Sequence, residues 1–361
     1  MIVRAFITHK LKENYADCQD RFGVNSDTKS IAVSDGMGST WQQKIWAQLL
    51  VDTFTKSNKW LPTHETIKPL CKIWHKTVES FIQNLRDTNA PANIIYRNER
   101  NLAEGKSAGA TIVGIRFDKN RWEGSVLGDS CLIEWNGNDV RFYTSQDVEA
   151  FDSFPDYFDS NEERQGKGTP KAISGILDKG GYLFLVSDPF SDFLLEHNKQ
   201  GDISEYIQQL LKLTSHDEFE ALVDNWRIKG MHNDDTTLVI VEDDQSELIS
   251  TPIIPDDLNS MIEKERKENE KQKEFSLILV DPSQQKIQEQ QKNEIKKVEP
   301  KDKPCLTLVE EEVFRNDFLI EYREALKKRF PLAENFKFKW TQRAVIDAIS
   351  KIFNKYSIVS K

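Results

Sequence analysis

Short apolar runs and amphipathic segments alternate along the first two thirds of the chain, and this pattern changes after about Asp244. The apolar runs are rich in β-branched residues and are mostly bounded by Gly, Asp or Asn, which is typical of strands. They predict strands over the following segments: Ile2–Thr8, Ser30–Val33, Ala110–Phe117, Trp122–Leu127, Leu132–Trp135, Tyr182–Val186 and Thr237–Val241. Turn residues at 118–120 and 136–137 predict hairpins. Antiparallel pairing is therefore favoured over repeated βαβ units.

Apolar residues at helical spacing predict helices between these strands. One group follows the second strand and a later group precedes the last strand: Gln42–Lys56, Glu65–Arg86, Phe190–Glu196, Ile203–Leu213 and Glu218–Lys229. Because the helices come in groups, the order favours an α+β fold in which helices cover sheets. The polar stretch Thr144–Gly168 is expected to be a surface loop or flap.

The last third of the chain has a different composition. From Ile262 to Pro304 it is rich in Glu, Lys and Gln, which bury little apolar surface, so a linker or a solvated helix is expected. Within this stretch the apolar run Phe275–Val280 is expected either to add a strand to a sheet edge or to dock elsewhere. Helical spacing in Val309–Arg329 and Thr341–Asn354 predicts a small helical module. The predicted domains are residues 1–243, a charged and partly disordered linker over 244–308, and a C-terminal module over 309–361.

Composition narrows the class of protein. The chain has 361 residues, of which 38% are hydrophobic and 30% charged, so it can bury a substantial core. Its net charge of −10 gives no broad basic surface for nucleic acid. No apolar run approaches the roughly 20 residues of a membrane span, and the first residues are too polar for a signal peptide. Four cysteines without a C-x-x-C pair fit reduced thiols. A cytoplasmic protein without a membrane partner is expected.

Aspartates stand at the ends of the best predicted strands. Asp35 follows an apolar strand, Asp188 follows another, and Asp234 precedes a third. In an antiparallel sheet the end of one strand and the start of its neighbour share one rim, which allows these carboxylates to converge. Converging carboxylates repel one another unless cations neutralise them, and hard oxygen ligands suit Mg²⁺ or Mn²⁺. An aspartate at a strand end is also ordinary turn chemistry, so each acid alone is weak evidence.

Six short motifs, taken together and in order, resemble the metal-dependent protein phosphatases of the protein phosphatase 2C family. The motifs are Cys18–Phe22, Ala32–Ser39, Ser107–Thr111, Leu127–Ser130, Leu185–Asp188 and Asn233–Leu238, within roughly residues 1 to 243. Their details are more similar to the bacterial branch of the family. The resemblance implies an α-β-β-α sandwich, two antiparallel sheets flanked by helices, which is consistent with the α+β pattern.

The resemblance also implies a ligand set for divalent ions. Asp35 would bridge two metal ions, and the carbonyl of Gly36 would ligate one of them. Asp188 and Asp234 would complete the coordination of the first ion. The implied cofactors are two Mn²⁺ or Mg²⁺ ions, with a third, weaker ion in bacterial members.

Two further acids have implied roles beside these ligands. Asp20 would orient a water held by the metals, and Asp129 would help to hold the third ion. A phosphate-binding residue is not indicated, since none of the nearby cations His9, Lys10 and Lys12 stands out.

The sequence departs from the family pattern at several positions. Gln19 stands where many members carry Glu, and Pro189 replaces a usual Gly but suits the first turn of a helix. Asp235 replaces a usual Asn, and we expect it only to add negative charge beside the metals. Among the histidines, His232 alone lies next to the predicted acidic rim.

The implied function is that of a phosphoserine/phosphothreonine protein phosphatase, in which a water activated between two metal ions attacks the phosphomonoester. Phosphorylated proteins and a cognate Ser/Thr kinase are the partners that the resemblance implies. The alternative is a protein with the same fold but weak or no activity, which binds phosphoproteins or a partner kinase. Gln19 and Pro189 are the residues that support this alternative.

Overall fold

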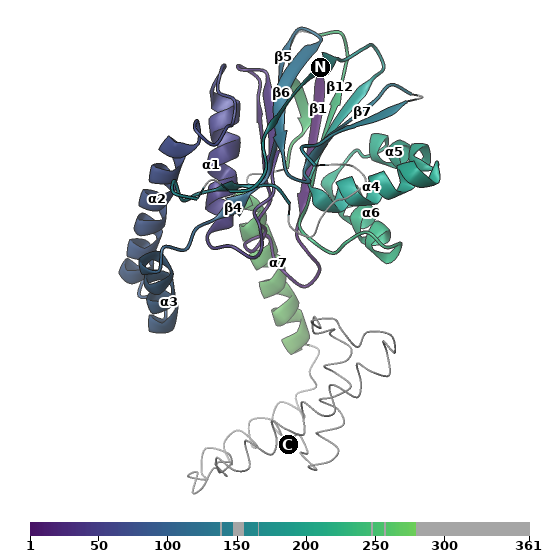
Figure 1. Cartoon of the computed structure of the whole chain (residues 1–361). Coiled ribbons are helices and arrows are strands. Elements are labelled where there is room, and N and C mark those ends of the chain that lie inside the picture. Colours follow the sequence, from purple (N-terminus) through teal and green to yellow (C-terminus); the bar gives the residue numbers. More distant parts are fainter. Residues whose placement is uncertain (138, 147–154, 165, 247, 256–257, 279–361) are drawn as a thin grey trace, which may run out of the picture. The chain divides into compact units, whose positions relative to one another are not determined.

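The computed structural model describes residues 1–278 apart from 138, 147–154, 165, 247 and 256–257 (Figure 1). Within this part of the chain, residues Met1–Glu274 form one compact unit. The predicted C-terminal module at 309–361 and the rest of the predicted linker after residue 278 lie outside the described residues.

Most of the strands belong to two sheets. Sheet A has the order β13-β1-β12-β11-β7-β8, and sheet B has the order β10-β6-β5-β3-β2. The strands of sheet A are β13 (Ser250–Ile253), β1 (Ile2–Thr8), β12 (Thr236–Glu242), β11 (Tyr182–Val186), β7 (Cys131–Trp135) and β8 (Val140–Tyr143). Those of sheet B are β10 (Lys171–Ile176), β6 (Arg121–Leu127), β5 (Ile112–Asp118), β3 (Ser30–Ser34) and β2 (Arg21–Asn25). Neighbouring strands in both sheets are antiparallel except β1 and β13, which are parallel.

Helices cover the outer face of each sheet (Figure 1). Sheet B is covered by α1 (Gln43–Lys56), with α2 (Lys68–Asp87) and α3 (Ala92–Ala103) beyond it. Sheet A is covered by α4 (Asp188–Gln200), α5 (Ile203–Leu211) and α6 (His216–Ile228). A last helix, α7, runs from Leu258 to Ile278. The expected α-β-β-α sandwich is confirmed.

Burial on both faces explains why the central strands read as continuous apolar runs. In β12, Val239 and Val241 lie in the core between the sheets, whereas Leu238 and Ile240 lie in the core under α4 to α6. Successive side chains of a strand point to opposite faces, so a strand with both faces covered needs apolar residues at every position. The small two-stranded sheet of β4 (Gly109–Ala110) and β9 (Phe158–Asp159) joins the expected flap to the body.

The strands, the two hairpins and the helices predicted within residues 1–243 are present, with small shifts at their ends. The pattern missed elements that bury little, among them β2, β10, β13 and α3. β10 is an edge strand with mostly exposed side chains, and the side chains of α3 are exposed or half-buried apart from Asn98.

The boundary after the predicted catalytic domain differs in the structure. The compact unit extends to Glu274 rather than residue 243, because β13 pairs with β1 and α7 follows. Residues 275–278 belong to helix α7, so a strand at Phe275–Val280 was the wrong expectation for these residues. Cys18, Cys71 and Cys131 are free and buried, and Cys305 lies outside the described residues.

Gly114 in β5 allows helix α1 to lie close to sheet B. A Cβ atom at this position would lie 2.8 Å from atoms of the Phe54 ring, and Phe54 is fully buried. Because a buried ring in a packed core has little room to move, the absence of a side chain at Gly114 sets the distance between α1 and the sheet that carries Asp35.

We expect Gly114→Ala to lower the free energy of unfolding by about 2 kcal/mol, because overpacking forces the ring out of place. Urea denaturation measures this change. In a Phe54→Leu background the same substitution should cost less, since the smaller side chain leaves room. An equal loss in both backgrounds would show that the Phe54 contact is not the cause.

Candidate metal centre

The predicted acids lie along one rim of the sandwich. Asp188 follows β11 and Asp234 precedes β12, and these strands are antiparallel neighbours with Val186 opposite Leu238. Ligand atoms of Asp188, Asp234 and His232 all lie within 4.8 Å of one another, a spacing that suits a metal ion. The structure thus brings together two of the predicted ligands and adds the histidine that stood beside the predicted rim.

Sheet B presents Asp35 to the same rim. Asp35 follows β3, and its backbone N–H donates to Thr111 Oγ1 at 3.1 Å while its carbonyl accepts from the Thr111 N–H at 2.9 Å. Thr111 Oγ1 in turn lies 2.7 Å from Ser130 Oγ. Gly36 packs against the backbone of Gln19, where an added Cβ would lie 3.0 Å from the Gln19 carbonyl oxygen. This contact requires a small residue directly after Asp35.

Asp20 and Asp129 each hold a buried oxygen without a partner. Asp20 is fully buried, and its Oδ2 accepts a hydrogen bond from Thr237 Oγ1 at 2.8 Å. Asp20 Oδ1 and Asp129 Oδ1 have no hydrogen-bond partner among the described residues. An unsatisfied buried carboxylate oxygen is costly, and a cation or an ordered water would remove that cost. The donor set and these free oxygens fit hard divalent ions.

Burial and mutual repulsion raise the pKa values of this cluster. Burial, followed by the charges of Asp129 and Asp234, raises the pKa of Asp35 to about 7. Burial and the charge of Asp192 raise the pKa of Asp129 to about 7. The pKa values of Asp20 and Asp188 are raised well above the usual range, first by burial and then by the charge of Asp35. Such groups stay ionised at neutral pH only when positive charge is nearby.

Lys10 supplies one positive charge to the centre. Its Nζ lies 2.6 Å from Asp234 Oδ1, and both side chains are partly exposed, at 21% and 33%. Burial lowers the pKa of Lys10, but its hydrogen bond to Asp234 and the charges of Asp234 and Asp235 together raise the pKa above its ordinary value. Of the three cations near the predicted site, Lys10 is therefore the one that contacts a predicted metal ligand.

Asp235 has a role that the sequence pattern did not indicate. It is 2% exposed, and its two carboxylate oxygens accept the backbone N–H groups of Lys10 at 3.0 Å and Gln19 at 2.8 Å. The expectation that this acid only adds negative charge was wrong. Asparagine has one acceptor oxygen in its side chain, whereas both carboxylate oxygens of aspartate can accept. The side chain therefore ties together both ends of the loop that precedes Asp20.

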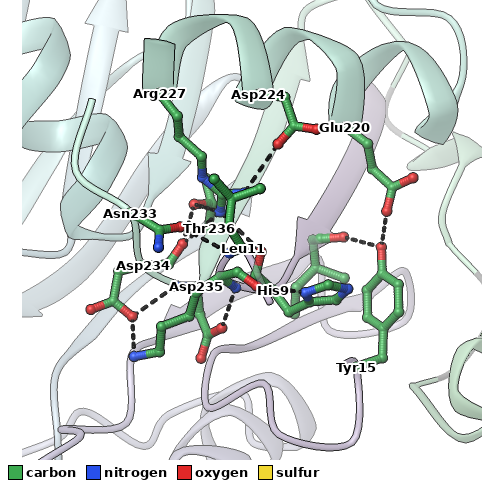
Figure 2. Close-up of polar contacts among 12 residues, drawn as sticks. His9, Leu11, Tyr15, Glu220, Asp224, Arg227, Asn233, Asp234, Asp235 and Thr236 are labelled. Carbon is green, nitrogen blue, oxygen red and sulfur yellow. Dashed lines mark hydrogen bonds and ion pairs between the residues drawn. The ribbon is translucent and has the colours of Figure 1, made fainter. Parts of the chain in front are cut away.

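Arg227 of α6 joins the same network (Figure 2). Its Nη2 donates to the carbonyl oxygens of His9 and Asp234 at 2.9 and 2.8 Å. The side chain is 4% exposed. A buried guanidinium thus links the end of β1 to the loop that carries Asp234.

Comparison with known proteins identifies the family. The family model described as protein phosphatase 2C matches residues 11–226, which is more than half of the chain. The chain belongs to the protein phosphatase 2C family, as its motifs indicated, and its enzyme class is that of the protein-serine/threonine phosphatases. No curated protein matches the chain. Among the described residues, no helix is long and apolar enough to cross a membrane.

The solved structures that match the chain include three bacterial proteins. The serine/threonine phosphatase Stp1 from Staphylococcus aureus is 14% identical, with a TM-score of 0.44, and the match covers 67% of this chain and 94% of that chain. PppA from Pseudomonas aeruginosa, described as a key regulatory component of T6SS, is 17% identical with a TM-score of 0.42, over 66% of this chain and 96% of that chain. The Mycobacterium tuberculosis serine/threonine phosphatase PstP/Ppp is 15% identical with a TM-score of 0.39, over 67% of this chain and 98% of that chain.

The pKa of Asp35 predicts how stability depends on pH without metal. A carboxyl group whose folded-state pKa is raised from 3.8 to about 7 binds more protons when folded, so its effect on stability becomes less favourable as pH rises from about 4 to about 7. In EDTA, the Asp35→Asn variant should therefore melt at a higher temperature than the wild type, by about 4 °C at pH 8 and less at pH 5.

Differential scanning fluorimetry measures both melting temperatures. Added Mn²⁺ should reverse the order at pH 8, because the ionised Asp35 then faces a cation. A difference in melting temperature that does not change between pH 5 and pH 8 would contradict a raised pKa.

Proposed function

We propose that the chain hydrolyses phosphoserine and phosphothreonine monoesters in proteins with divalent ions held at this centre. The observation that supports this most is the convergence of Asp188, His232 and Asp234 on one rim, with ligand atoms within 4.8 Å of one another. Divalent ions bound to such carboxylates neutralise phosphate oxygens and lower the pKa of a water molecule that attacks phosphorus.

The five predicted acids of this centre have three tasks in this proposal. Asp35, Asp188 and Asp234 hold the ions, and the carbonyl of Gly36 is a further ligand. Asp129 offers its free, buried Oδ1 to a third ion. Asp20 does not ligate an ion. Its Oδ2 is held by Thr237, and its free Oδ1 accepts a hydrogen bond from the attacking water and so orients it.

The alternative, a phosphatase fold that binds phosphoproteins without turnover, has less support. Pro189 lies in the first turn of α4, and Ser187 before that helix has the extended backbone usual for a cap residue, so the turn that positions Asp188 is kept. Gln19, which stands where many members of the family carry Glu, is the remaining residue that favours weak activity. The substrates that we propose are phosphorylated proteins, and their phosphates would come from a Ser/Thr kinase in a signalling pair in the cytoplasm.

His232 indicates which ion the centre prefers. Imidazole is a better ligand for Mn²⁺ than for Mg²⁺, which prefers oxygen. We propose that His232, which is exposed and lies beside Asp188 and Asp234, adds a nitrogen ligand and favours Mn²⁺.

We expect His232→Asn to weaken Mn²⁺ binding about tenfold while leaving Mg²⁺ binding nearly unchanged. Calorimetry measures both affinities, and pulsed electron paramagnetic resonance detects nitrogen coupled to bound Mn²⁺. The coupling should vanish in this variant and persist in His75→Asn, which alters an exposed histidine of α2. Equal loss of both ions would contradict a selective role.

The Asp35→Asn variant tests turnover itself. Purified wild type should release phosphate from a phosphothreonine peptide only with Mn²⁺ or Mg²⁺, and Asp35→Asn should reduce kcat at least about 100-fold because a metal ligand is lost. Asp118→Asn, which changes an exposed aspartate at the end of β5, is the matched control and should keep full activity. A folded wild type that binds Mn²⁺ but hydrolyses no peptide would favour the phosphoprotein-binding alternative.

A further inference from the structure

The loop between β1 and β2 carries residues of the metal centre at both ends. Lys10 near its start is paired with Asp234, and Asp20 at its end is buried against Thr237. We call residues 9–20 the carrier loop. A change at either end of this loop would move a charge or a hydrogen-bond acceptor at the centre.

Residues that precede β12 hold the ends of the carrier loop. Asp235 accepts from Lys10 and Gln19, and Asn233 Oδ1 accepts the N–H of Leu11 at 2.9 Å. Figure 2 shows Leu11 beside Asn233 and the ring of Tyr15 reaching toward Glu220. The middle of the loop is held by other groups: Lys44 Nζ donates to the Ala16 carbonyl oxygen at 2.9 Å, and Tyr15 contacts α6 and α7.

Tyr15 anchors the middle of the loop in two directions. Its hydroxyl donates to Glu220 Oε1 at 2.5 Å, and its ring packs edge-on against His9. Its backbone N–H donates to Glu265 Oε2 of helix α7 at 3.0 Å. Tyr15 is 7% exposed, so this network is largely screened from water.

Glu265 is the point at which α7 contacts the carrier loop. Its side chain is 23% exposed, and Oε1 lies 3.5 Å from His9 Nε2 in addition to the contact with Tyr15. Glu263, one half-turn earlier, is 53% exposed and is paired with Arg266 of the same helix. Both residues belong to the compact unit, yet both lie beyond residues 11–226, to which the family model applies.

A short turn connects Tyr15 to Asp20. The N–H of Cys18 donates to the Tyr15 carbonyl at 3.2 Å, and the N–H of Gln19 is held by Asp235. Cys18 is fully buried. The backbone between the Glu265 contact and Asp20 is thus short and constrained.

We propose that Glu265 is a positioning residue for the metal centre: helix α7 holds the carrier loop through Tyr15 and His9, and thereby sets where Lys10 and Asp20 lie. The segment that follows the phosphatase domain then contributes to metal binding without contacting the ions. This inference rests on the proposed function, because it assigns the loop a task in that centre.

The test uses Glu265→Ala in the full chain, with Glu265→Gln and Glu263→Ala for comparison. Hydrogen exchange of the peptide that spans residues 10–19, followed by mass spectrometry without metal, reports on the carrier loop. Glu265→Ala should speed this exchange about fivefold, because one backbone hydrogen bond is lost. Mn²⁺ affinity, measured by electron paramagnetic resonance, should fall about threefold.

The two comparison variants separate a local contact from a general effect on the helix. Glu265→Gln keeps an acceptor oxygen and should restore most of the protection and affinity, and Glu263→Ala should match the wild type. Unchanged loop exchange in Glu265→Ala would refute the contact, and faster exchange with unaltered Mn²⁺ affinity would refute the positioning role. An equal effect of Glu263→Ala would also refute it.

The same data distinguish this inference from the proposed function. A wild type that binds no Mn²⁺ would overturn both. A wild type that binds Mn²⁺ but hydrolyses no phosphopeptide would overturn the phosphatase proposal alone, because loop exchange and Mn²⁺ affinity do not depend on turnover.

Discussion

Electrostatic repulsion among buried carboxylates is the constraint on which the rest of this structure depends. Burial raises the pKa values of Asp20, Asp35 and Asp188, and the charge of Asp35 raises those of Asp20 and Asp188 further. An isolated chain would separate such charges. The fold keeps them together because each acid directly follows or precedes a strand or a helix that is fixed by packing elsewhere, so relaxation of the rim would require whole strands to move.

Packing on both faces of both sheets keeps these strands from moving. The central strands contribute side chains to a core between the sheets and to a second core under the helices. One core lies between the sheets and one lies under the helices of each sheet. These three cores stabilise the strands whose ends carry the carboxylates. The free energy gained by packing these cores offsets the repulsion among the carboxylates, as is common where a protein forms a binding site for a cation.

Three residues outside the predicted ligand set lie in the same region. Asp235 uses both oxygens to close the carrier loop, and His232 adds an imidazole beside the carboxylates. Glu265 comes from a helix outside the part that matches the family model. The candidate centre thus has supporting contacts from residues beyond the predicted ligands, and Asp235 and Glu265 both hold the backbone of the carrier loop.

The residue pattern by itself determined an antiparallel α+β fold and the positions of the acids along it, and the resemblance to the family added the sandwich. Continuous apolar runs marked strands buried on both faces, and Asp35, Asp188 and Asp234 were visible because each stands at the end of such a run. Edge elements such as β10 and β13 were not visible, since exposed strands carry little apolar pattern. Only the tertiary structure revealed the contacts of Asp235 and Glu265, whose hydrogen-bond partners are 216 to 250 positions away in the chain. A local pattern reports on burial within one element, whereas such contacts arise only when distant elements pack together.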